Sequence, residues 1–259
     1  MSSRALYLFC ITRPGDPYRF APPEGMAGFE GAALLTLAIG DLVAVCCEVD
    51  LPDWTGPEAQ ERLQEIRWVA PRALLHEEVV SASFALAPTY PMRFGTIFSD
   101  AAALHERVGA LRTELLDFYS RTSGCAEWSI KGWLDSDALG AALSQHDDSA
   151  PTSGAAYLLR KRRERDLREH MDSWIRERAD DLRALIAPFT RDVSSMATRG
   201  ATRDVDDRAL VLKWAALVRL DDLDALERAI EPLKDELAQN GLDLELVGPW
   251  PAYSFRHPS

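Results

Sequence analysis

The sequence predicts an α+β fold in two domains, at 1–123 and 124–259. Residues 33–50 contain two apolar runs separated by a Gly-Asp pair, a pattern typical of a β-hairpin. Residues 126–247 follow the order β-α-β-β-α-β with a long first helix, which is the order of a ferredoxin-like unit. We therefore expect an N-terminal α+β domain followed by a ferredoxin-like domain with an aromatic tail.

The first domain should open with a strand, because its first apolar run is rich in Leu, Tyr, Phe and Ile. Gly40 and Asp41 suit the hairpin turn, since glycine accepts a positive φ. Pro71 should break or restart the helical pattern around it, because proline lacks a backbone donor. In order, we expect a strand at 4–11, a loop to about residue 31, the hairpin at 33–50, helical residues at 56–87, an edge strand at 88–98 and a helix from Ser99 to near Gly124.

The second domain shows a clearer alternation of strand and helix periods. Apolar side chains recur at period two in its strands and at helical spacing between them. The expected elements are a strand at 126–135, a helix interrupted by a loop at 145–154 and continuing to 189, strands at 189–198 and 209–220, a helix at 221–241 and a strand at 242–248.

Composition and charge exclude several classes of protein. Hydrophobic residues make up 47% and charged residues 27%, which are ordinary values for a folded chain. The net charge of -12 argues against general nucleic-acid binding, which draws on surplus Lys and Arg. No uncharged apolar run approaches the roughly 18 to 20 residues that span a bilayer, and the first dozen residues lack a signal-peptide pattern. We expect a cytoplasmic protein that binds neither nucleic acid nor membrane.

The sequence offers little catalytic chemistry. It contains no G-x-G-x-x-G, P-loop, G-x-S-x-G or H-E-x-x-H motif. The five histidines are scattered, and His76 with Glu77 and Glu78 is the nearest approach to a cluster. The four cysteines lack C-x-x-C spacing and are expected to be reduced apolar fillers. We expect no catalytic residues, no metal and no cofactor.

Arg93 and its neighbour Phe94 are candidate structural or interface residues in the apolar stretch "PMRFGTIF". An arginine among apolar residues either reaches solvent along its aliphatic stem or pairs with a carboxylate, because burying an unpaired charge is costly. We expect an ion pair between Arg93 and Glu77 or Glu78. A substrate-binding role for Arg93 is the alternative.

A basic segment, "RKRRERDLR" at 160–168, supplies three more interface candidates: Arg160, Arg162 and Arg163. On a helix these charges project around most of the circumference, so a solvated helix is one interpretation. Docking to an acidic partner surface is another. An RNA site is disfavoured, because no aromatic residue lies among the basic ones to stack on a base.

The aromatic tail contains Trp250, Tyr253 and Phe255, interleaved with Pro249 and Pro251. The prolines fix φ and hold the segment extended, which lowers the entropy lost when it docks. The three aromatics should either pack against the junction of the protein's own domains or form an exposed hot spot for a partner.

Several segments together resemble the gas vesicle protein F and L family, accessory proteins of gas vesicle formation. They run in order along the whole sequence, and "PMRFGT" and "GPWPAYSF" are unusual strings. The segments are "LYLFCI", "GDLVAVCCEVD", "ALLHEEVV", "PMRFGTIF", "EWSIKGW", "AYLLRKR" and "LELVGPWPAYSF". The short "RPGDPY" loop and the Cys46-Cys47 pair depart from the family pattern and leave the subtype, F or L, open.

The resemblance implies a cytoplasmic, non-enzymatic protein of gas vesicle assembly, with two α+β domains of which the second is ferredoxin-like. It implies contact with the hydrophobic shell protein and with other gas vesicle accessory proteins during vesicle nucleation. It supplies no catalytic residue. A small-molecule enzyme or sensor with a site in a ferredoxin-like cleft is the alternative function, because that fold hosts many unrelated activities.

Overall fold

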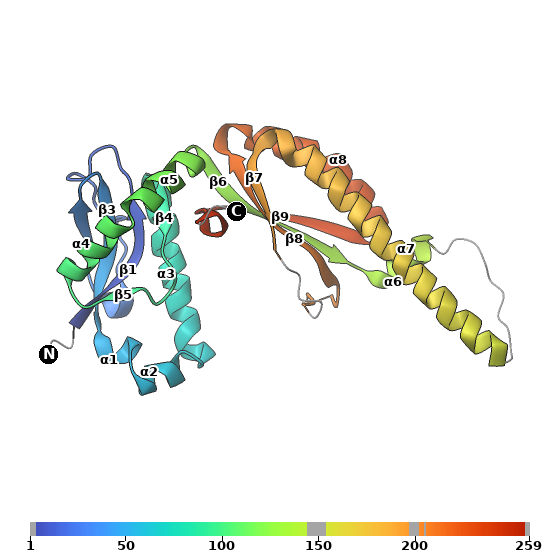
Figure 1. The fold of residues 1–259 in the computed structure, drawn as a ribbon, viewed down its shortest axis with the longest axis horizontal. Coiled ribbons are helices and arrows are strands. Elements are labelled where there is room, and N and C mark those ends of the chain that lie inside the picture. The colour runs from blue at the N-terminus through green and yellow to red at the C-terminus, as the bar shows by residue number, and fades with distance from the viewer. Residues whose placement is uncertain (1–3, 144–153, 197–201, 205, 257–259) are drawn as a thin grey trace. The chain divides into compact units, whose positions relative to one another are not determined.

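A computed structural model of the chain describes residues 4–143, 154–196, 202–204 and 206–256, and for 154–160 it describes the backbone alone. The chain divides into two compact units (Figure 1). Unit 1 comprises Met1–Ser123 and Trp250–Ser259, and unit 2 comprises Gly124–Pro249. Residues 250–259, which the sequence assigned to the second domain, therefore group with the first unit.

Unit 1 contains a five-stranded sheet in the order β2-β3-β1-β4, with β5 also paired to β1. All of these pairings are antiparallel. The predicted hairpin at 33–50 is confirmed, and Gly40 in its turn has a φ of +66°. The strands are β1 (Arg4–Thr12), β2 (Leu34–Ile39), β3 (Leu42–Asp50), β4 (Thr89–Pro91) and β5 (Ile97–Phe98).

Helices cover both faces of this sheet, so that every residue of β1 after Arg4 is buried. Val79 and Val80 of α3 pack with one face, while α4 and α5 cover the other (Figure 1). The helices are α1 (Leu51–Trp54), α2 (Pro57–Arg62), α3 (Ile66–Leu86), α4 (Ala101–Ala110) and α5 (Arg112–Thr122), with short 3-10 turns η1 (Phe29–Gly31) and η4 (Tyr253–Phe255).

The expected break at Pro71 is wrong. Pro71 lies inside α3, and the chain breaks between α2 and α3, at residues 63–65. A helical proline leaves the carbonyl of residue i−4 without its donor. Both Pro71 and Arg67 are exposed, so solvent can reach this part of the helix and satisfy that carbonyl.

Unit 2 contains a four-stranded sheet in the order β7-β8-β6-β9, and its elements follow the order β-α-β-β-α-β. The β6·β8 and β7·β8 pairs are antiparallel. Its strands are β6 (Cys125–Leu134), β7 (Thr190–Ser195), β8 (Ala209–Arg219) and β9 (Leu242–Trp250). Its helices are α6 (Ser136–Leu143), α7 (Gly154–Ile186) and α8 (Leu223–Gln239), with 3-10 turns η2 (Ala187–Phe189) and η3 (Leu220–Asp222).

The core of unit 2 lies between the sheet and its helices. Leu134 and Leu242 from the strands are buried with Leu139 and Leu237 from α6 and α8, and Trp174 of α7 packs against them. Helices α7 and α8 run side by side over the sheet (Figure 1). From Trp128 to Leu134, burial alternates along β6, as expected for a strand with one covered face.

The mixed α+β fold predicted from the sequence is confirmed. Within the described part of the chain, no helix combines the length and apolar character needed to cross a membrane.

Candidate functional site

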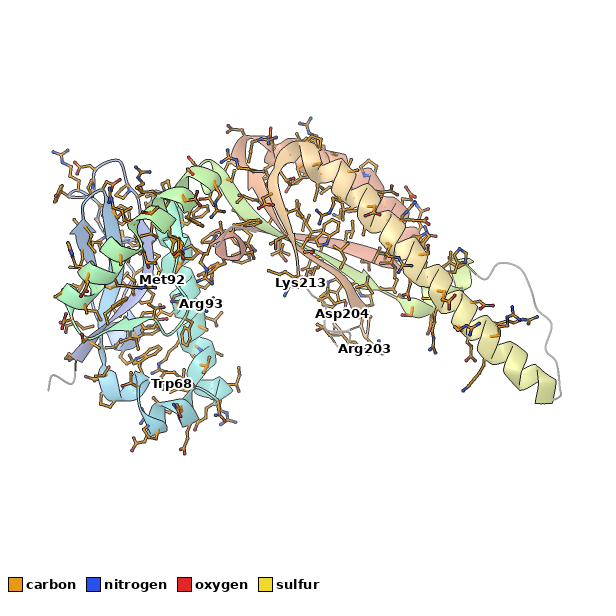
Figure 2. The ribbon with its side chains drawn as sticks, in the orientation of Figure 1. Trp68, Met92, Arg93, Arg203, Asp204 and Lys213 are labelled. Atoms are coloured by element: carbon orange, nitrogen blue, oxygen red, sulfur yellow. The ribbon has the colours of Figure 1, made fainter. Side chains whose placement is uncertain are left out.

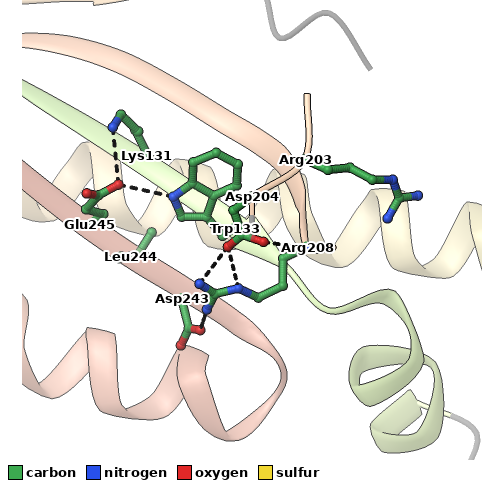
Figure 3. Close-up of a pocket in the computed structure, with 8 residues that line it drawn as sticks. All are labelled: Lys131, Trp133, Arg203, Asp204, Arg208, Asp243, Leu244 and Glu245. Atoms are coloured by element: carbon green, nitrogen blue, oxygen red, sulfur yellow. Dashed lines mark hydrogen bonds and ion pairs between the residues drawn. The ribbon is translucent and has the colours of Figure 1, made fainter. Parts of the chain in front are cut away.

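A pocket of about 790 Å³ opens on unit 2, on the side of the sheet that carries charged residues (Figure 3). It collects side chains from β6, from β9 and from the segment that leads into β8. The lining residues are Lys131, Trp133, Arg203, Asp204, Arg208, Asp243, Leu244 and Glu245. They include no histidine, cysteine or serine, so they do not supply the usual nucleophile and base of a hydrolytic site.

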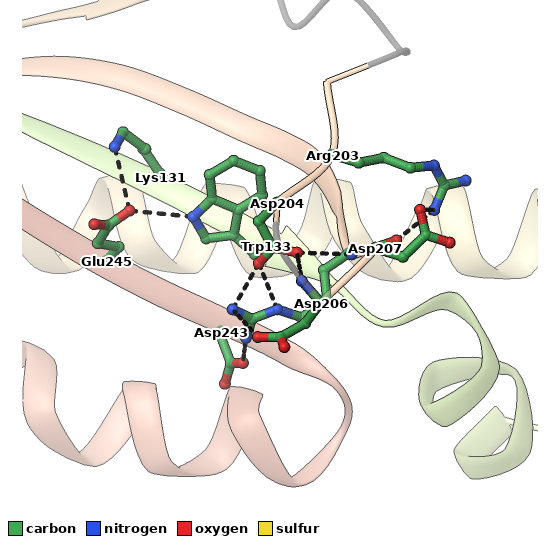
Figure 4. Close-up of polar contacts among 9 residues, drawn as sticks. Lys131, Trp133, Arg203, Asp204, Asp206, Asp207, Asp243 and Glu245 are labelled. Carbon is green, nitrogen blue, oxygen red and sulfur yellow. Dashed lines mark hydrogen bonds and ion pairs between the residues drawn. The ribbon is translucent and has the colours of Figure 1, made fainter.

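Arg208 is the centre of an ion-pair network at this pocket (Figure 3), and Figure 4 labels the carboxylates that it contacts, Asp204, Asp206 and Asp243. Its Nη2 lies 2.6 Å from Oδ2 of Asp204 and 3.6 Å from Oδ2 of Asp206, and its Nη1 donates to Asp243. Backbone N–H groups of Asp206 and Arg208 also donate to Asp204, at 3.0 and 2.9 Å. Arg208 is therefore held by several carboxylates, and it ties the loop before β8 to β9.

Glu245 is the second charged centre. It accepts hydrogen bonds from Trp133 Nε1 at 3.1 Å and from Lys131 Nζ at 3.2 Å. The Trp133 bond, followed by the Lys131 contact, holds the pKa of Glu245 below its usual value. Lys131 lies directly opposite Lys213 on the neighbouring strand β8, so two like charges face each other on adjacent strands. The site as a whole is polar, with most of its charges paired internally.

A smaller groove of about 350 Å³ lies on unit 1, beside the edge strand β2. Its apolar part comes from β1 and β2, and its far end is the first turn of α4, where Asp100 caps the helix by accepting from Ala103 N–H at 2.8 Å. The lining residues are Arg4, Ala5, Leu6, Leu35, Leu37, Glu48, Ser99, Asp100 and Ala101. This groove can take aliphatic side chains.

An aromatic cluster fills the interior of unit 1 around Tyr7. The Tyr7 hydroxyl lies 2.9 Å from His76 Nδ1 and accepts the Gly95 N–H at 3.0 Å. His76 Nε2 lies 3.3 Å from the Met92 carbonyl oxygen. Burial lowers the pKa of His76 to about 4, so the ring is neutral at neutral pH. The other rings in the cluster are Phe9, Phe29, Trp54, Trp68 and Phe94.

Residues 5–257 match the family described as "Gas vesicle synthesis protein GvpL/GvpF". The chain belongs to the GvpL/GvpF family. Gas vesicle protein L of Streptomyces sp. (strain CB03234) is 30% identical over 265 residues, which cover 98% of this chain and 93% of that protein. Gas vesicle protein L1 of Halobacterium salinarum is 24% identical over 98% of this chain and 90% of its own length.

Two solved GvpF structures share the fold of this GvpL/GvpF family member. The crystal structure from Anabaena sp. PCC7120 superposes with a TM-score of 0.73 at 14% identity, covering 99% of this chain and 98% of that one. The structure from Microcystis aeruginosa gives a TM-score of 0.66 at 16% identity, with coverage of 98% and 99%. The fold is therefore retained where little sequence identity remains.

Arg93 does not form the predicted ion pair with Glu77 or Glu78. It is exposed in the turn between β4 and β5, and it has no ion pair with any residue that the structure describes (Figure 2). Glu77 instead accepts from Ser81 Oγ at 3.2 Å. An arginine whose head reaches water needs no carboxylate, which is the first of the two outcomes open to it. Phe94, by contrast, packs with the aromatic cluster.

The aromatic tail packs largely into unit 1. Phe255 is 1% exposed, and its carbonyl accepts from Arg121 Nη1 at 3.2 Å. Tyr253 packs against the core that contains Tyr7, and burial, followed by the Glu77 carboxylate, raises its pKa. Trp250 remains 37% exposed. Two of the three aromatics thus have a structural role, and a role in partner binding stays a prediction.

The basic segment lies in the exposed part of α7. Arg162 lies 3.9 Å from Asp166, one helical turn away, and Arg163 is also exposed. The side chain of Arg160 lies outside the described residues. Exposed pairs of this spacing contribute little to stability, so the segment's role at a partner surface stays a prediction.

Sequence reasoning missed the Tyr7–His76 pair and the polar pocket. Tyr7 and His76 are far apart along the chain, and only their shared apolar surroundings hinted that both are buried. The described residues contain no group of three or more His, Cys, Asp or Glu side chains that could hold a metal.

Proposed function

We propose that this GvpL/GvpF family member is a non-enzymatic assembly protein, which binds the hydrophobic shell protein and other accessory proteins while a gas vesicle is nucleated. It acts in the cytoplasm and at the growing vesicle. Membership of the family along residues 5–257 supports the vesicle assignment. The paired charges of the unit 2 pocket give no support to the alternative of an enzyme or sensor.

One observation carries the proposal: the exposed large apolar side chains are concentrated on unit 1. Of the eight such side chains among the described residues, only Leu220 belongs to unit 2. Three of the others lie within twelve residues: Leu63, Ile66 and Leu74 are 41%, 73% and 65% exposed. Ile66 and Leu74 are eight residues apart on α3, so they project from the same side of the helix. We name Ile66 and Leu74 of α3, together with Leu63 just before this helix, the α3 stripe.

An exposed apolar stripe suits an apolar partner. Exposed apolar side chains that gather in one part of a protein are a feature of interaction surfaces. A hydrophobic shell subunit in water would aggregate through its own apolar faces and strand edges unless a partner covered them. Unit 1 is the part of the chain that we propose holds the shell subunit.

Unit 2 offers a surface of different chemistry. Its pocket is lined mainly by charged side chains, and the basic segment of α7 adds positive charge. These features fit the charged surfaces of other accessory proteins better than an apolar shell subunit. The β-α-β-β-α-β order and the strand order β7-β8-β6-β9 support the further proposal that unit 2 is a ferredoxin-like domain.

Co-purification tests the assignment to unit 1. The tagged chain is expressed with the shell protein, and recovery of shell protein is compared between the wild type, the double variant Ile66→Glu/Leu74→Glu and Leu220→Glu. We expect the double variant to lose at least tenfold of the bound shell protein. Leu220→Glu, a matched change at a 51% exposed leucine of unit 2, should retain it. All three should melt at similar temperatures, because the altered side chains are exposed.

If the wild type recovers no shell protein at low or moderate salt, the proposed function fails. If Leu220→Glu loses the shell protein as fully as the double variant, the assignment to unit 1 fails.

A further inference from the structure

The sheet edges of this protein differ in how they are protected. An unpaired edge is a template for another strand, and proteins guard it with charges, prolines or short strands. In unit 2, edge strand β7 carries Arg191 and Asp192, while β9 carries Asp243, Glu245 and Pro249. In unit 1, β4 and β5 form one edge and are only three and two residues long, with Pro91 in β4.

Strand β2 is an edge without these guards. Its six residues read Leu-Leu-Thr-Leu-Ala-Ile, with no charge and no proline. It pairs with β3 from Leu34↔Cys47 to Ile39↔Leu42, and it has no strand partner on its other side in the part of the chain that the structure describes. In an antiparallel pair, alternate residues direct their backbone N–H and C=O groups away from the partner. The outer side of β2 therefore presents backbone groups that another strand can bind.

The groove described above lies on the face of the sheet between β1 and the start of α4, and this edge strand lines part of it. Leu35 and Leu37 of β2 lie two residues apart, so both project to the same face and form the apolar wall with Leu6 of β1. Leu35 is 37% exposed. Charges occur toward the ends of the groove, where Arg4 lies 4.0 Å from Glu48 and where Asp100 caps α4. An extended segment along β2 would place every second side chain over the apolar wall.

We propose that β2 binds an extended, apolar segment of the shell subunit by strand addition, with alternate side chains of that segment entering the groove. The inference rests on the proposed function and adds a second contact on unit 1 to the α3 stripe. Backbone hydrogen bonds along β2 provide affinity, and the groove selects aliphatic side chains at every second position. A charged residue at those positions is rejected, because it would have to be buried without a partner.

Guarding the edge by mutation tests the inference. Leu35→Lys places a charge in the groove and at the edge, which is how natural edge strands resist pairing. Ala38→Lys places a charge on the opposite face of β2, at an exposed residue of the same edge and outside the groove. Leu220→Lys on unit 2 is the matched control. With the shell protein co-expressed, we expect both β2 variants to retain at most a tenth of the wild-type amount and the control to retain all of it.

Hydrogen exchange gives a second measurement that does not depend on any variant. Binding of the shell protein to the wild-type chain should slow exchange of β2 amides at least tenfold, and the amides of β7 should be unaffected. Melting temperatures of the variants, measured alone, identify any loss that comes from unfolding. A variant that unfolds is set aside, and exchange in the wild type then decides the question.

Three results would overturn the inference. The first is full retention of the shell protein by folded Leu35→Lys and Ala38→Lys chains, while Ile66→Glu/Leu74→Glu loses it. In that case the proposed function would still hold. The second is unchanged exchange in β2 of the bound wild-type chain. The third is a wild-type dimer that Leu35→Lys converts to a monomer, because the edge would then belong to a second copy of this chain.

Discussion

The two sheets of this protein differ in how their faces are covered. In unit 1, helices cover both faces, and β1 is a continuous apolar run in which each residue after Arg4 is buried. In unit 2, burial along β6 alternates from Trp128 to Leu134, and the polar face carries Lys131 and Glu245. The sheet with two covered faces has the unguarded edge, and the sheet with a polar face has guarded edges.

This difference separates two kinds of recognition within one chain. The edge of unit 1 offers backbone groups and aliphatic walls, which suit an apolar, extended partner. The face of unit 2 offers paired charges, which suit a polar partner and a salt-dependent contact. A variant that disturbs one surface should therefore leave binding at the other intact.

Removing an aromatic of the tail should produce the largest loss of stability, and it should fall on unit 1. Phe255 is 1% exposed, and phenylalanine-to-alanine changes in a core cost about 3 to 5 kcal/mol. We expect Phe255→Ala to lower the free energy of unfolding of unit 1 by that amount in a urea titration. Trp250→Ala, at a 37% exposed residue, should cost less than half as much. Equal losses in the two variants would contradict the packing of the tail described here.

Acidic pH should lower the free energy of unfolding of unit 1, because His76 takes up a proton when the unit unfolds. The pKa of His76 in the folded chain is lowered to about 4 from an unfolded value of 6.5, so between these pH values only the unfolded chain binds the proton. Stability from the neutral ring is complete above pH 6.5 and is lost as the pH falls toward 4, at up to about 1.4 kcal/mol per pH unit. Urea titrations at several pH values measure this slope.

The matched variant for this pH dependence is His76→Gln, which removes the titrating group. Its unfolding free energy should fall less steeply between pH 6.5 and 4 than that of the wild type. Parallel slopes in the two proteins would show that other groups cause the acid sensitivity.

The hydroxyl of Tyr7 tests the polar contacts inside the aromatic cluster. Tyr7→Phe keeps the ring but leaves His76 Nδ1 and the Gly95 N–H without this partner, at a cost of about 1 to 3 kcal/mol. Thermal and urea unfolding should both report the loss. Tyr18→Phe, at an 84% exposed tyrosine of the same unit, should have no measurable effect. A neutral Tyr7→Phe would mean that the cluster depends on ring packing alone.

The smallest effect is expected on the polar face of unit 2. Lys213 lies directly opposite Lys131, and like charges in that position destabilise a sheet. Lys213→Glu should raise the free energy of unfolding of unit 2 by about 0.2 to 1 kcal/mol, with Lys213→Ala between it and the wild type. The gain should shrink in 1 M salt. A loss of stability in Lys213→Glu would show that Lys213 has a favourable role in the isolated protein.

The sequence predicted the local elements better than the long-range contacts, and the reason differs from case to case. The hairpin turn depends on Gly40 and Asp41 alone, so local chemistry sufficed. Helix α3 continues through Pro71 because this part of the helix is exposed to solvent. The local sequence does not show which part of a helix will be exposed. Because a buried unpaired charge is costly, Arg93 could either reach water or pair with a carboxylate. Only the folded structure shows that its side chain is exposed.

The candidate sites were still harder to predict. The polar pocket joins Lys131, Arg208 and Glu245, whose separation along the chain hides their proximity. The groove at β2 requires knowing that β2 is an edge strand, because the same apolar run in a central strand would be unremarkable. The tail was singled out by its aromatics, yet periodicity carries no information about which unit a segment joins.

The return of residues 250–256 to unit 1 has a consequence for synthesis on the ribosome. Unit 1 receives Phe255 and Tyr253 only after the whole of unit 2 has been translated, and unit 2 needs β9, which immediately precedes them. Neither unit is complete until residues 242–256 have been made, although domains commonly fold one after another from the N-terminus. A chain released early, before these residues are added, would leave the interior of unit 1 open to water and to proteases. Completion of both units thus requires residues 242–256, so an intact unit 1 reports that the sequence before them has been made.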